Sequence, residues 1–338
     1  MSDPTRPPAP RIIALANQKG GVGKTTTAIN LAAALCEVGQ KVLLVDLDPQ
    51  GNASTGLGAE PGSRGLTTYD LLIEDASLVD VIRSTNVAGL SLCPATTDLS
   101  SADIELVSNE KRSFLLHDAL RQPAIDTYGF DYVLIDCPPS LSLLTVNAMI
   151  AAQSVLVPLQ AEFFALEGLS QLMLTIRTVR QSANRDLRIE GVVLTMYDGR
   201  NNLSQQVEND ARSNLGELVF RTVIPRNVRV SEAPSYSMPV LAYDPLSKGS
   251  TAYRSLAREL LAPVVDVGRG VRDVGLEAGL AAQERGAQLR HQFLTGVGLG
   301  AERRGVVLVE AGPRQPLGVA GRVRELVKER GVVTLGPL

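Results

Sequence analysis

A glycine-rich segment near the amino terminus has the residue types that bind phosphate groups. It reads Asn17-Gln18-Lys19-Gly20-Gly21-Val22-Gly23-Lys24-Thr25-Thr26. Glycines let the backbone wrap closely, so that successive N–H groups point at phosphate oxygens. Lys24 can then bring a positive charge to the terminal phosphates of a nucleotide, and the Thr25 hydroxyl can ligate Mg²⁺. A tight turn needs only one glycine, so this pattern favours a phosphate-binding loop over a purely structural turn.

Three aspartates could complete such a site. Asp46 ends an apolar run and Asp48 follows it, while Asp136 ends another apolar run. Carboxylates at the carboxyl ends of parallel strands face the crevice where ligands bind. An aspartate that ends a hydrophobic strand can hold Mg²⁺ through water in nucleotide-hydrolysing proteins. Such an aspartate is alternatively a simple helix cap, but the phosphate-binding loop favours the functional interpretation.

The segments that must position these residues alternate between strand and helix patterns. Helical periodicity follows the phosphate loop, from Lys24 to Val38. Apolar runs of strand length are Ile12–Asn17, Lys41–Asp46, Tyr132–Cys137, Ser154–Leu159 and Ile189–Met196. Apolar strands separated by helices are typical of a parallel sheet covered on both faces. The sequence therefore predicts an α/β fold of the P-loop NTPase type, with a doubly wound, mostly parallel sheet.

The composition is that of an ordinary globular protein. The chain has 338 residues, of which 44% are hydrophobic and 20% charged. No run reaches the roughly 18 apolar residues of a membrane-spanning helix, and the amino terminus lacks an apolar signal-peptide core. Its three cysteines are far apart, and its two histidines are too few for a histidine-rich metal site. We expect a cytoplasmic protein.

Charge is distributed unevenly along the chain. Residues 1–184 carry 12 Lys and Arg against 19 Asp and Glu, net −7, whereas residues 185–258 carry 10 against 8, net +2. Because the overall field is unfavourable, any affinity for nucleic acid must come from a local basic patch.

The alternating pattern occupies residues 11–266. Residues 1–10 contain four prolines and are expected to form a disordered arm. Residues 267–338 form a Gly/Arg-rich extension that holds 14 of the chain's 30 glycines. Within it, Val319–Arg330 has a short apolar helical face, which could serve a membrane or partner helix. Because this face has no aromatic anchor, a solvated arm is the favoured interpretation.

The phosphate loop departs from the ordinary GxxxxGK[ST] pattern at one end. Gln18 stands where the first glycine would be, and Lys19 follows it. This loop resembles the deviant Walker A loop, KGGxGK[ST], of the ParA/MinD superfamily. The resemblance implies that Lys19 reaches across a two-fold axis to the nucleotide of the other subunit, as an arginine finger does elsewhere. On spacing alone, Lys19 could equally be a solvated loop charge.

Longer motifs narrow the resemblance to the chromosomal ParA proteins, also called Soj. They are Asp46–Asn52, Leu194–Val207 and Val223–Ala257, and the similarity runs from about Arg11 to Leu261. The resemblance implies a slow, partner-stimulated ATPase that uses ATP and Mg²⁺ to partition chromosomes or plasmids. The ATP-bound homodimer would bind double-stranded DNA without sequence preference, and a ParB-type centromere-binding protein would stimulate hydrolysis and release it. Such a protein is nucleoid-associated, and membrane binding is not expected.

The resemblance also assigns roles to individual residues. Asp48 would position the attacking water beside the catalytic Lys19, and Asp46, Thr25 and Asp136 would surround Mg²⁺. Pro225 and Asn227 would lie against the adenine, although an ordinary loop proline would leave the same pattern. The residues expected to bind ATP through the loop are Lys19, Gly20, Gly21, Val22, Gly23, Lys24, Thr25 and Thr26.

Basic residues of the segment with positive balance are the candidates for DNA contact. Recognition of the DNA backbone needs only Lys and Arg directed at phosphates. The candidates are Arg200, Arg221, Arg226, Arg229 and Lys248. Taken singly, each could be a solvated surface charge. Only 18 residues precede Lys19, too few for the helix-turn-helix domain of longer plasmid relatives, so operator binding is not expected.

Two other functions remain open at this stage. The chain could be a MinD-like membrane-surface ATPase, which the Val319–Arg330 segment favours and the PRNVR and SEAPS motifs oppose. It could also be a metabolic P-loop enzyme of the same superfamily, although the sequence reveals no second substrate pocket.

Overall fold

The computed structural model describes residues 9–162 and 165–262 of the chain. All of them belong to the first of the two units into which the chain divides, Met1–Gln283. Almost all of the expected arm, residues 1–10, lies outside the described residues. The same holds for the whole expected extension, residues 267–338, with its amphipathic segment.

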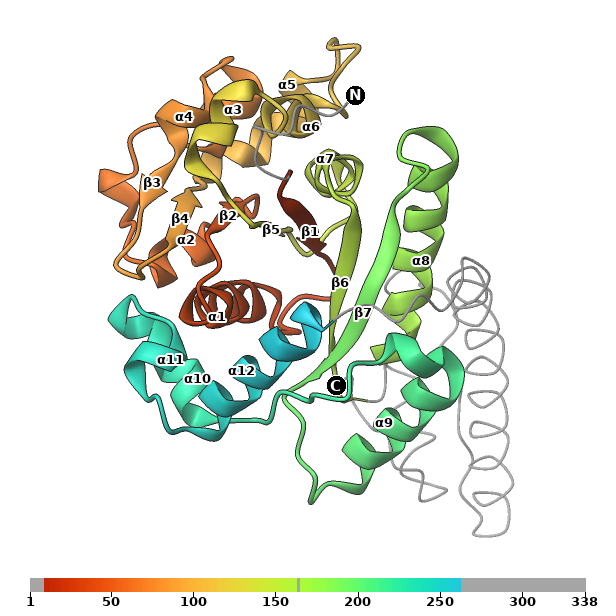
Figure 1. The fold of residues 1–338 in the computed structure, drawn as a ribbon. Helices are drawn as coiled ribbons and strands as arrows, with labels where there is room; N and C mark the ends of the chain where they lie inside the picture. Colours follow the sequence, from red (N-terminus) through yellow and green to blue (C-terminus); the bar gives the residue numbers. More distant parts are fainter. Residues whose placement is uncertain (1–8, 163–164, 263–338) are drawn as a thin grey trace, which may run out of the picture. The chain divides into compact units, whose positions relative to one another are not determined.

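Within the described residues, strands form one sheet in the order β3-β4-β2-β5-β1-β6-β7 (Figure 1). They are β1 (Arg11–Leu15), β2 (Val42–Asp46), β3 (Arg83–Ser84), β4 (Leu90–Cys93), β5 (Tyr132–Asp136), β6 (Ser154–Gln160) and β7 (Arg188–Thr195). Neighbouring strands pair in parallel, except that β3 is antiparallel to β4. The predicted doubly wound, mostly parallel sheet is confirmed, and each predicted strand matches an observed one within two residues.

Helices cover both faces of this sheet (Figure 1). The α-helices are α1 (Lys24–Glu37), α2 (Asn52–Gly56), α3 (Thr68–Ile73), α4 (Leu78–Val81), α5 (Ala102–Glu105), α6 (Leu115–Ala119), α7 (Leu143–Ala151), α8 (Ala165–Ser182), α9 (Asn202–Leu215), α10 (Val228–Glu232), α11 (Val240–Tyr243) and α12 (Lys248–Leu261). Short 3₁₀ helices are η1 (Pro61–Ser63), η2 (Thr97–Ser101), η3 (Pro123–Tyr128), η4 (Gly216–Leu218) and η5 (Ala233–Tyr236). No helix in the described ranges is long and apolar enough to cross a membrane.

Two apolar layers hold these elements together, because alternate residues of each buried strand face opposite sides of the sheet. Ile13 and Leu15 of β1 pack with α1, α11 and α12 on one side. Ile12 and Ala14 pack with helices that include α7, α8 and α9 on the other side. The alanine-rich sequence of α1 favours a helix and keeps its surface flat, so that α12 can approach closely.

Strand register brings the candidate catalytic residues to one edge of the sheet. In the parallel pairs, Asp46 of β2 stands opposite Asp136 of β5, and Asp136 stands opposite Leu15 of β1. The phosphate loop follows β1 directly. Because parallel strands end at the same edge, the loop and both carboxylates lie side by side.

The boundary of the domain can be tested by truncation. A chain that ends at Val267 should keep its cooperative unfolding, with a melting temperature within about 3 °C of the full chain, because residues 267–338 lack the α/β pattern. A chain that ends at Ser247 should lose cooperative unfolding, because it lacks Tyr253 and Leu256, which α12 buries in the core. Thermal denaturation followed by circular dichroism measures both. Aggregation of the Val267 chain would instead mean that the extension packs on the domain.

Candidate active site

The phosphate loop has the backbone shape that anion binding requires. Gly21 and Gly23 adopt positive φ angles of 74° and 84°, which glycine reaches without strain. Gly23 is also the N-cap of α1, where no side chain accepts a hydrogen bond from the first N–H groups. These N–H groups and the positive end of the helix dipole are therefore left for a bound phosphate.

Hydrogen bonds to two neighbouring strands hold this loop in place. The Asn17 amide nitrogen donates to the Pro158 carbonyl at 2.7 Å, and its oxygen accepts from the Lys19 N–H at 3.0 Å. At the other end of the loop, the buried Thr195 hydroxyl donates to the Val22 carbonyl at 2.8 Å. The carboxyl ends of β6 and β7 thus fix the loop before any ligand is present.

Lys24 places its charge inside the loop. Its side chain is buried, and Nζ donates to the Lys19 carbonyl at 3.2 Å. Burial lowers the pKa of Lys24, while the nearby Asp136 and Asp48 carboxylates favour the charged form and oppose that effect. The Lys24 ammonium therefore interacts electrostatically with two of the aspartates at this edge.

Lys19 lies at the surface beside a residue that sequence reasoning missed. Its ammonium is 3.7 Å from the Glu162 carboxylate, and the Arg226 guanidinium is 4.0 Å from the same carboxylate. Glu162 follows the end of β6, and that position was its only signal in the sequence. The structure therefore places two predicted functional cations, one from the loop and one from the basic segment, next to a single acidic residue.

Asp46 is fully buried and saturated with hydrogen bonds. One oxygen accepts from the Asp48 N–H at 3.1 Å, and the other accepts from the N–H and the hydroxyl of Ser54 at 2.9 and 2.7 Å. Burial raises the pKa of Asp46 to about 6, although these hydrogen bonds oppose the rise. Its carboxylate thus holds α2 against the end of β2.

Asp136 has the opposite environment. It is fully buried, and neither of its carboxylate oxygens has a regular hydrogen-bond partner. Burial raises the pKa of Asp136 well above its usual value, and the Asp46 charge adds to this effect. The Thr25 hydroxyl and the Lys24 ammonium lie close enough to oppose it. A buried carboxylate without partners, beside a hydroxyl and a phosphate loop, fits a hydrated divalent cation.

Asp48 lies at the start of the turn that leads into α2. The residue is 7% exposed, and one carboxylate oxygen accepts from the Gln50 N–H at 3.0 Å. Its carbonyl accepts from the Gly51 N–H at 2.8 Å. The Asp48 carboxylate is also close enough to Lys24 to influence the pKa of that lysine. A carboxylate so placed can accept a hydrogen bond from a water molecule.

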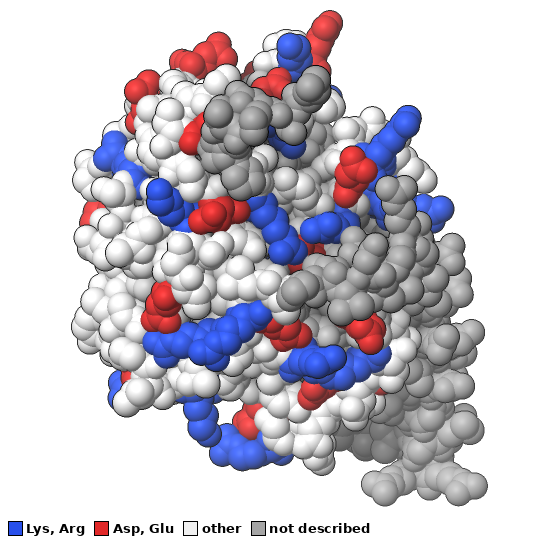
Figure 2. Space-filling model, viewed as in Figure 1, with Lys and Arg blue, Asp and Glu red and all other residues white. Residues whose placement is uncertain are grey.

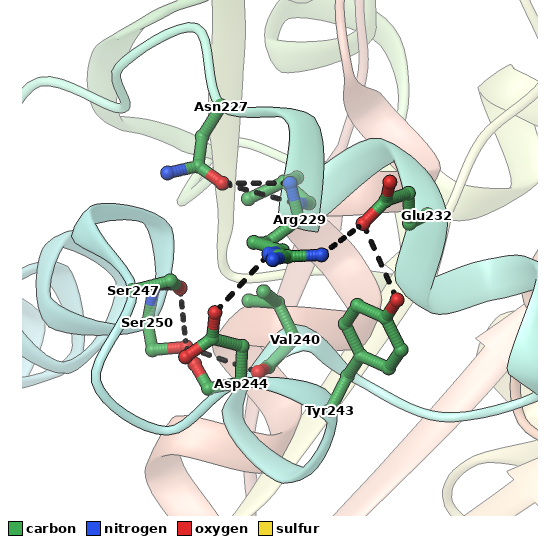
Figure 3. Close-up of polar contacts among 9 residues, drawn as sticks. Asn227, Arg229, Glu232, Val240, Tyr243, Asp244, Ser247 and Ser250 are labelled. Atoms are coloured by element: carbon green, nitrogen blue, oxygen red, sulfur yellow. Dashed lines mark hydrogen bonds and ion pairs between the residues drawn. The ribbon is translucent and has the colours of Figure 1, made fainter.

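The predicted base-contacting residues lie on the segment that follows Val223. Pro225 pairs with Tyr197 at the end of β7, and the Arg226 N–H donates to the Tyr197 carbonyl at 3.0 Å. The Asn227 oxygen caps α10, because it accepts from the N–H groups of Arg229 and Val230 (Figure 3). Its amide nitrogen remains the only group of that side chain with which it could donate to a base.

A cavity of about 490 Å³ opens where β6 and β7 end. It is lined by Ala161, Glu162, Met196, Asp198, Asn201, Leu203, Ser204 and Arg226. Neither Pro225 nor Asn227 lines it, so the structure does not bring the two predicted base-contacting residues into this cavity.

Most of the predicted DNA-contacting residues already have acidic partners. Arg200 makes two hydrogen bonds of 3.0 Å to Asp198 and lowers the pKa of that carboxyl to about 2. The Arg229 guanidinium lies between Glu232, at 2.9 Å, and Asp244, at 3.3 Å (Figure 3). On the face shown in Figure 2, basic and acidic atoms accordingly alternate.

Two of the five predicted DNA-contacting residues differ from the others in that their side chains have no acidic partner among the described residues. Arg221 and Lys248 are exposed, and in the described part of the chain neither forms an ion pair. Lys248 is the first residue of α12, where Ser247 is the N-cap. Their charges are therefore the most available for a phosphate backbone.

Comparisons with known proteins agree with this fold. Residues 10–189 match the family model described as an AAA domain. The chain is 59% identical over 252 residues to the chromosome partitioning protein ParA of Caulobacter vibrioides (strain NA1000 / CB15N), which covers 74% of this chain and 94% of the relative. It is 51% identical over 252 residues to the sporulation initiation inhibitor protein Soj of Bacillus subtilis (strain 168), covering 75% and 98%.

Solved structures show the same similarity. The cobyrinic acid a,c-diamide synthase of Mycobacterium smegmatis, with bound ADP and magnesium, has a TM-score of 0.64 at 40% identity, over 75% of this chain and 94% of that one. The cell division ATPase MinD of Pyrococcus furiosus has a TM-score of 0.60 at 29% identity, over 74% and 98%. The similarity to ParA and Soj, at 51–59% identity over nearly their whole length, shows that this chain belongs to the ParA (Soj) family of P-loop ATPases.

Proposed function

We propose that this chain is an ATP-dependent partitioning protein that segregates a chromosome or plasmid. The observation that carries the proposal is the edge of the sheet where the uncapped start of α1, the buried Lys24 and the unpartnered Asp136 meet. The relatives that the chain covers almost completely are named for chromosome partitioning and sporulation control. Residues 11–266 would form the ATPase domain.

ATP would bind with its phosphates in the loop. The N–H groups from Gly20 to Thr26 would surround the phosphate oxygens, and Lys24 would leave the Lys19 carbonyl to pair with them. Pro225 and the amide nitrogen of Asn227 would contact the adenine. Thr25 and Asp136 would hold Mg²⁺, which neutralises charge on the phosphates when bound. Asp46 would support this site from its hydrogen-bonded position next to Asp136.

Hydrolysis would require two subunits. Lys19 is exposed enough to leave Glu162 and reach the phosphates of a partner subunit, where it would stabilise the charge of the transition state. Asp48 would orient the attacking water in the same subunit that holds the nucleotide. Because one catalytic group comes from the partner, turnover would be slow until the closed dimer forms.

The ATP-bound homodimer would bind double-stranded DNA through phosphate contacts, and a ParB-type partner would trigger hydrolysis and release. Arg221 and Lys248 are the strongest candidates for contact, with Arg200, Arg226 and Arg229 supporting them. This cycle would keep the protein in the cytoplasm and on the nucleoid.

A pelleting experiment tests the proposal against the alternatives. The full chain should sediment with DNA in the presence of ATP and not with anionic lipid vesicles. Sedimentation with vesicles alone would favour a MinD-like membrane function. ATP hydrolysis without either interaction would favour a metabolic enzyme, a class represented by the synthase of 40% identity.

The two loop lysines should have separable roles. Lys24→Ala should abolish nucleotide binding, because it removes the cation inside the loop. Lys19→Ala should still bind ATP but lose about 1,000-fold in hydrolysis rate, the size of an arginine-finger effect. Titration with a fluorescent ATP analogue and phosphate release measure these effects, and Lys41→Ala, at an exposed position outside the site, is the control. Normal ATPase activity of Lys19→Ala would exclude a role in the partner's site.

Asp48 can be tested by a pair of substitutions. Asp48→Asn keeps an acceptor for the Gln50 N–H but removes the charge, whereas Asp48→Ala removes both. Both variants should bind ATP and Mg²⁺ and accumulate as closed dimers without turnover, because only the group that orients water is lost. Gel filtration with ATP shows the dimer. If Asp48→Asn stays monomeric with bound ATP, the assignment is wrong.

Salt dependence distinguishes the free cations from the paired ones. With ATP, log affinity for DNA should fall with log salt at about −0.9 per phosphate neutralised, equally for two unrelated duplexes. Arg221→Ala or Lys248→Ala should flatten this slope by up to about two units, because a dimer presents each residue twice. Arg229→Ala, which breaks two ion pairs, should change the slope less and lower thermal stability instead. Equal binding with ADP, or preference for one duplex, would contradict the proposal.

A further inference from the structure

A buried arginine lies behind the turn that carries Asp48. Arg64 is only 4% exposed, and in the described ranges no carboxylate pairs with it. Its guanidinium instead donates to four neutral oxygens. They are the carbonyls of Gly51, Ala59 and Ala95 and the hydroxyl of Thr55. A buried guanidinium is stable only when its N–H groups are satisfied, so these contacts define one position for it.

The four acceptors come from α2, the residues on either side of it and the segment after β4. Gly51 is the N-cap of α2, Thr55 is its second-last residue, Ala59 follows α2, and Ala95 follows β4. Arg64 thus ties both ends of α2 to the edge of the sheet. Ser54, inside α2, adds a parallel connection, because its hydroxyl donates to Asp46 and accepts from the Ala95 N–H.

Gly51 connects the Arg64 side chain to the turn formed by residues 48–51. Its carbonyl accepts from Arg64 at 3.2 Å, while its N–H donates to the Asp48 carbonyl at 2.8 Å. Gly51 has a φ angle of 60°, and a Cβ atom there would lie 2.3 Å from a terminal nitrogen of Arg64 and 3.2 Å from the Ala95 carbonyl oxygen. The turn therefore closes around the guanidinium with no room for a side chain.

We propose that Arg64 is a positioning residue for hydrolysis, which fixes the Asp48–Gly51 turn and so the place of the Asp48 carboxylate relative to the phosphate loop. This inference rests on the proposed ATPase function. Arg64 contacts neither the loop nor Lys24, so it acts on the orientation of Asp48 and not on phosphate binding. A lysine cannot replace it. The planar guanidinium donates from three nitrogen atoms to four separate acceptors, whereas a lysine has only one nitrogen atom at the end of its side chain.

The test compares Arg64→Lys and Arg64→Met with the wild-type full chain. Both variants should lose between about 10-fold and 100-fold in kcat, since small displacements of a catalytic group have effects of this size. KM for ATP and the affinity for a non-hydrolysable ATP analogue should change by less than about threefold, because the phosphate contacts stay in place. Arg83→Met is the matched control, since Arg83 donates to the Ser63 carbonyl beside Arg64 but does not reach the Asp48 turn.

A second variant changes the contact between Gly51 and Arg64 from the Gly51 side. Gly51→Ala should reduce kcat in the same way. The kcat of the double variant Gly51→Ala/Arg64→Met should be no lower than that of the more severe single variant, because both substitutions disrupt the same contact between Gly51 and Arg64. Unchanged kcat in Arg64→Lys, or a loss of analogue binding equal to the loss of kcat, would overturn the inference. If Arg64→Met does not fold, Arg64→Lys and Gly51→Ala decide. Absence of ATPase activity in the wild-type chain would instead contradict the proposed function itself.

Discussion

Two buried carboxylates are forced together by the register of β2 and β5, and the rest of the site depends on how their charges are accommodated. Asp46 stands opposite Asp136, and both are inaccessible to water. Like charges on adjacent strands in a poorly polarisable interior disfavour simultaneous ionisation of both carboxyl groups. The chain stabilises one of them with three hydrogen bonds and leaves the other without any. The unsatisfied member, Asp136, is the one beside the Thr25 hydroxyl, where a cation would arrive together with a nucleotide.

This asymmetry explains the arrangement of the surrounding elements. The hydrogen bonds to Asp46 come from α2 and from the turn before it, so the charged group also determines where α2 begins. Arg64 fixes the same helix through neutral acceptors, the carbonyls of Gly51 and Ala59 and the hydroxyl of Thr55. Lys24 is the cation whose charge favours ionisation of Asp136. Hydrogen bonds of Asp46 and Arg64 therefore hold this edge of the sheet in addition to apolar packing.

Sequence patterns predicted the strands and the phosphate loop better than the side-chain contacts around them. Long apolar strands and the glycine-rich loop have local signals, and the sheet that they imply is confirmed. β3 and β4 were not predicted, because two to four residues at a sheet edge leave too short a pattern. The acidic partners of Arg200 and Arg229, the saturation of Asp46 and the burial of Arg64 depend on tertiary neighbours. Arg64 in particular follows Pro61–Ser63 in a polar loop, where an exposed charge would be the ordinary expectation.

The distribution of paired and unpaired cations limits how DNA could be held. Arg229 stabilises the fold by joining α10 to the turn before α12, so its charge is already partly neutralised. Among the five candidates, which all lie in the described part of the chain, only Arg221 and Lys248 form no ion pair, against a net charge of −7 over residues 1–184. Weak contacts of this kind gain strength when two copies act on one duplex, because the second copy binds at a high effective concentration. In the proposed cycle, the joining and separation of two subunits would therefore control DNA affinity without rearranging the basic surface itself.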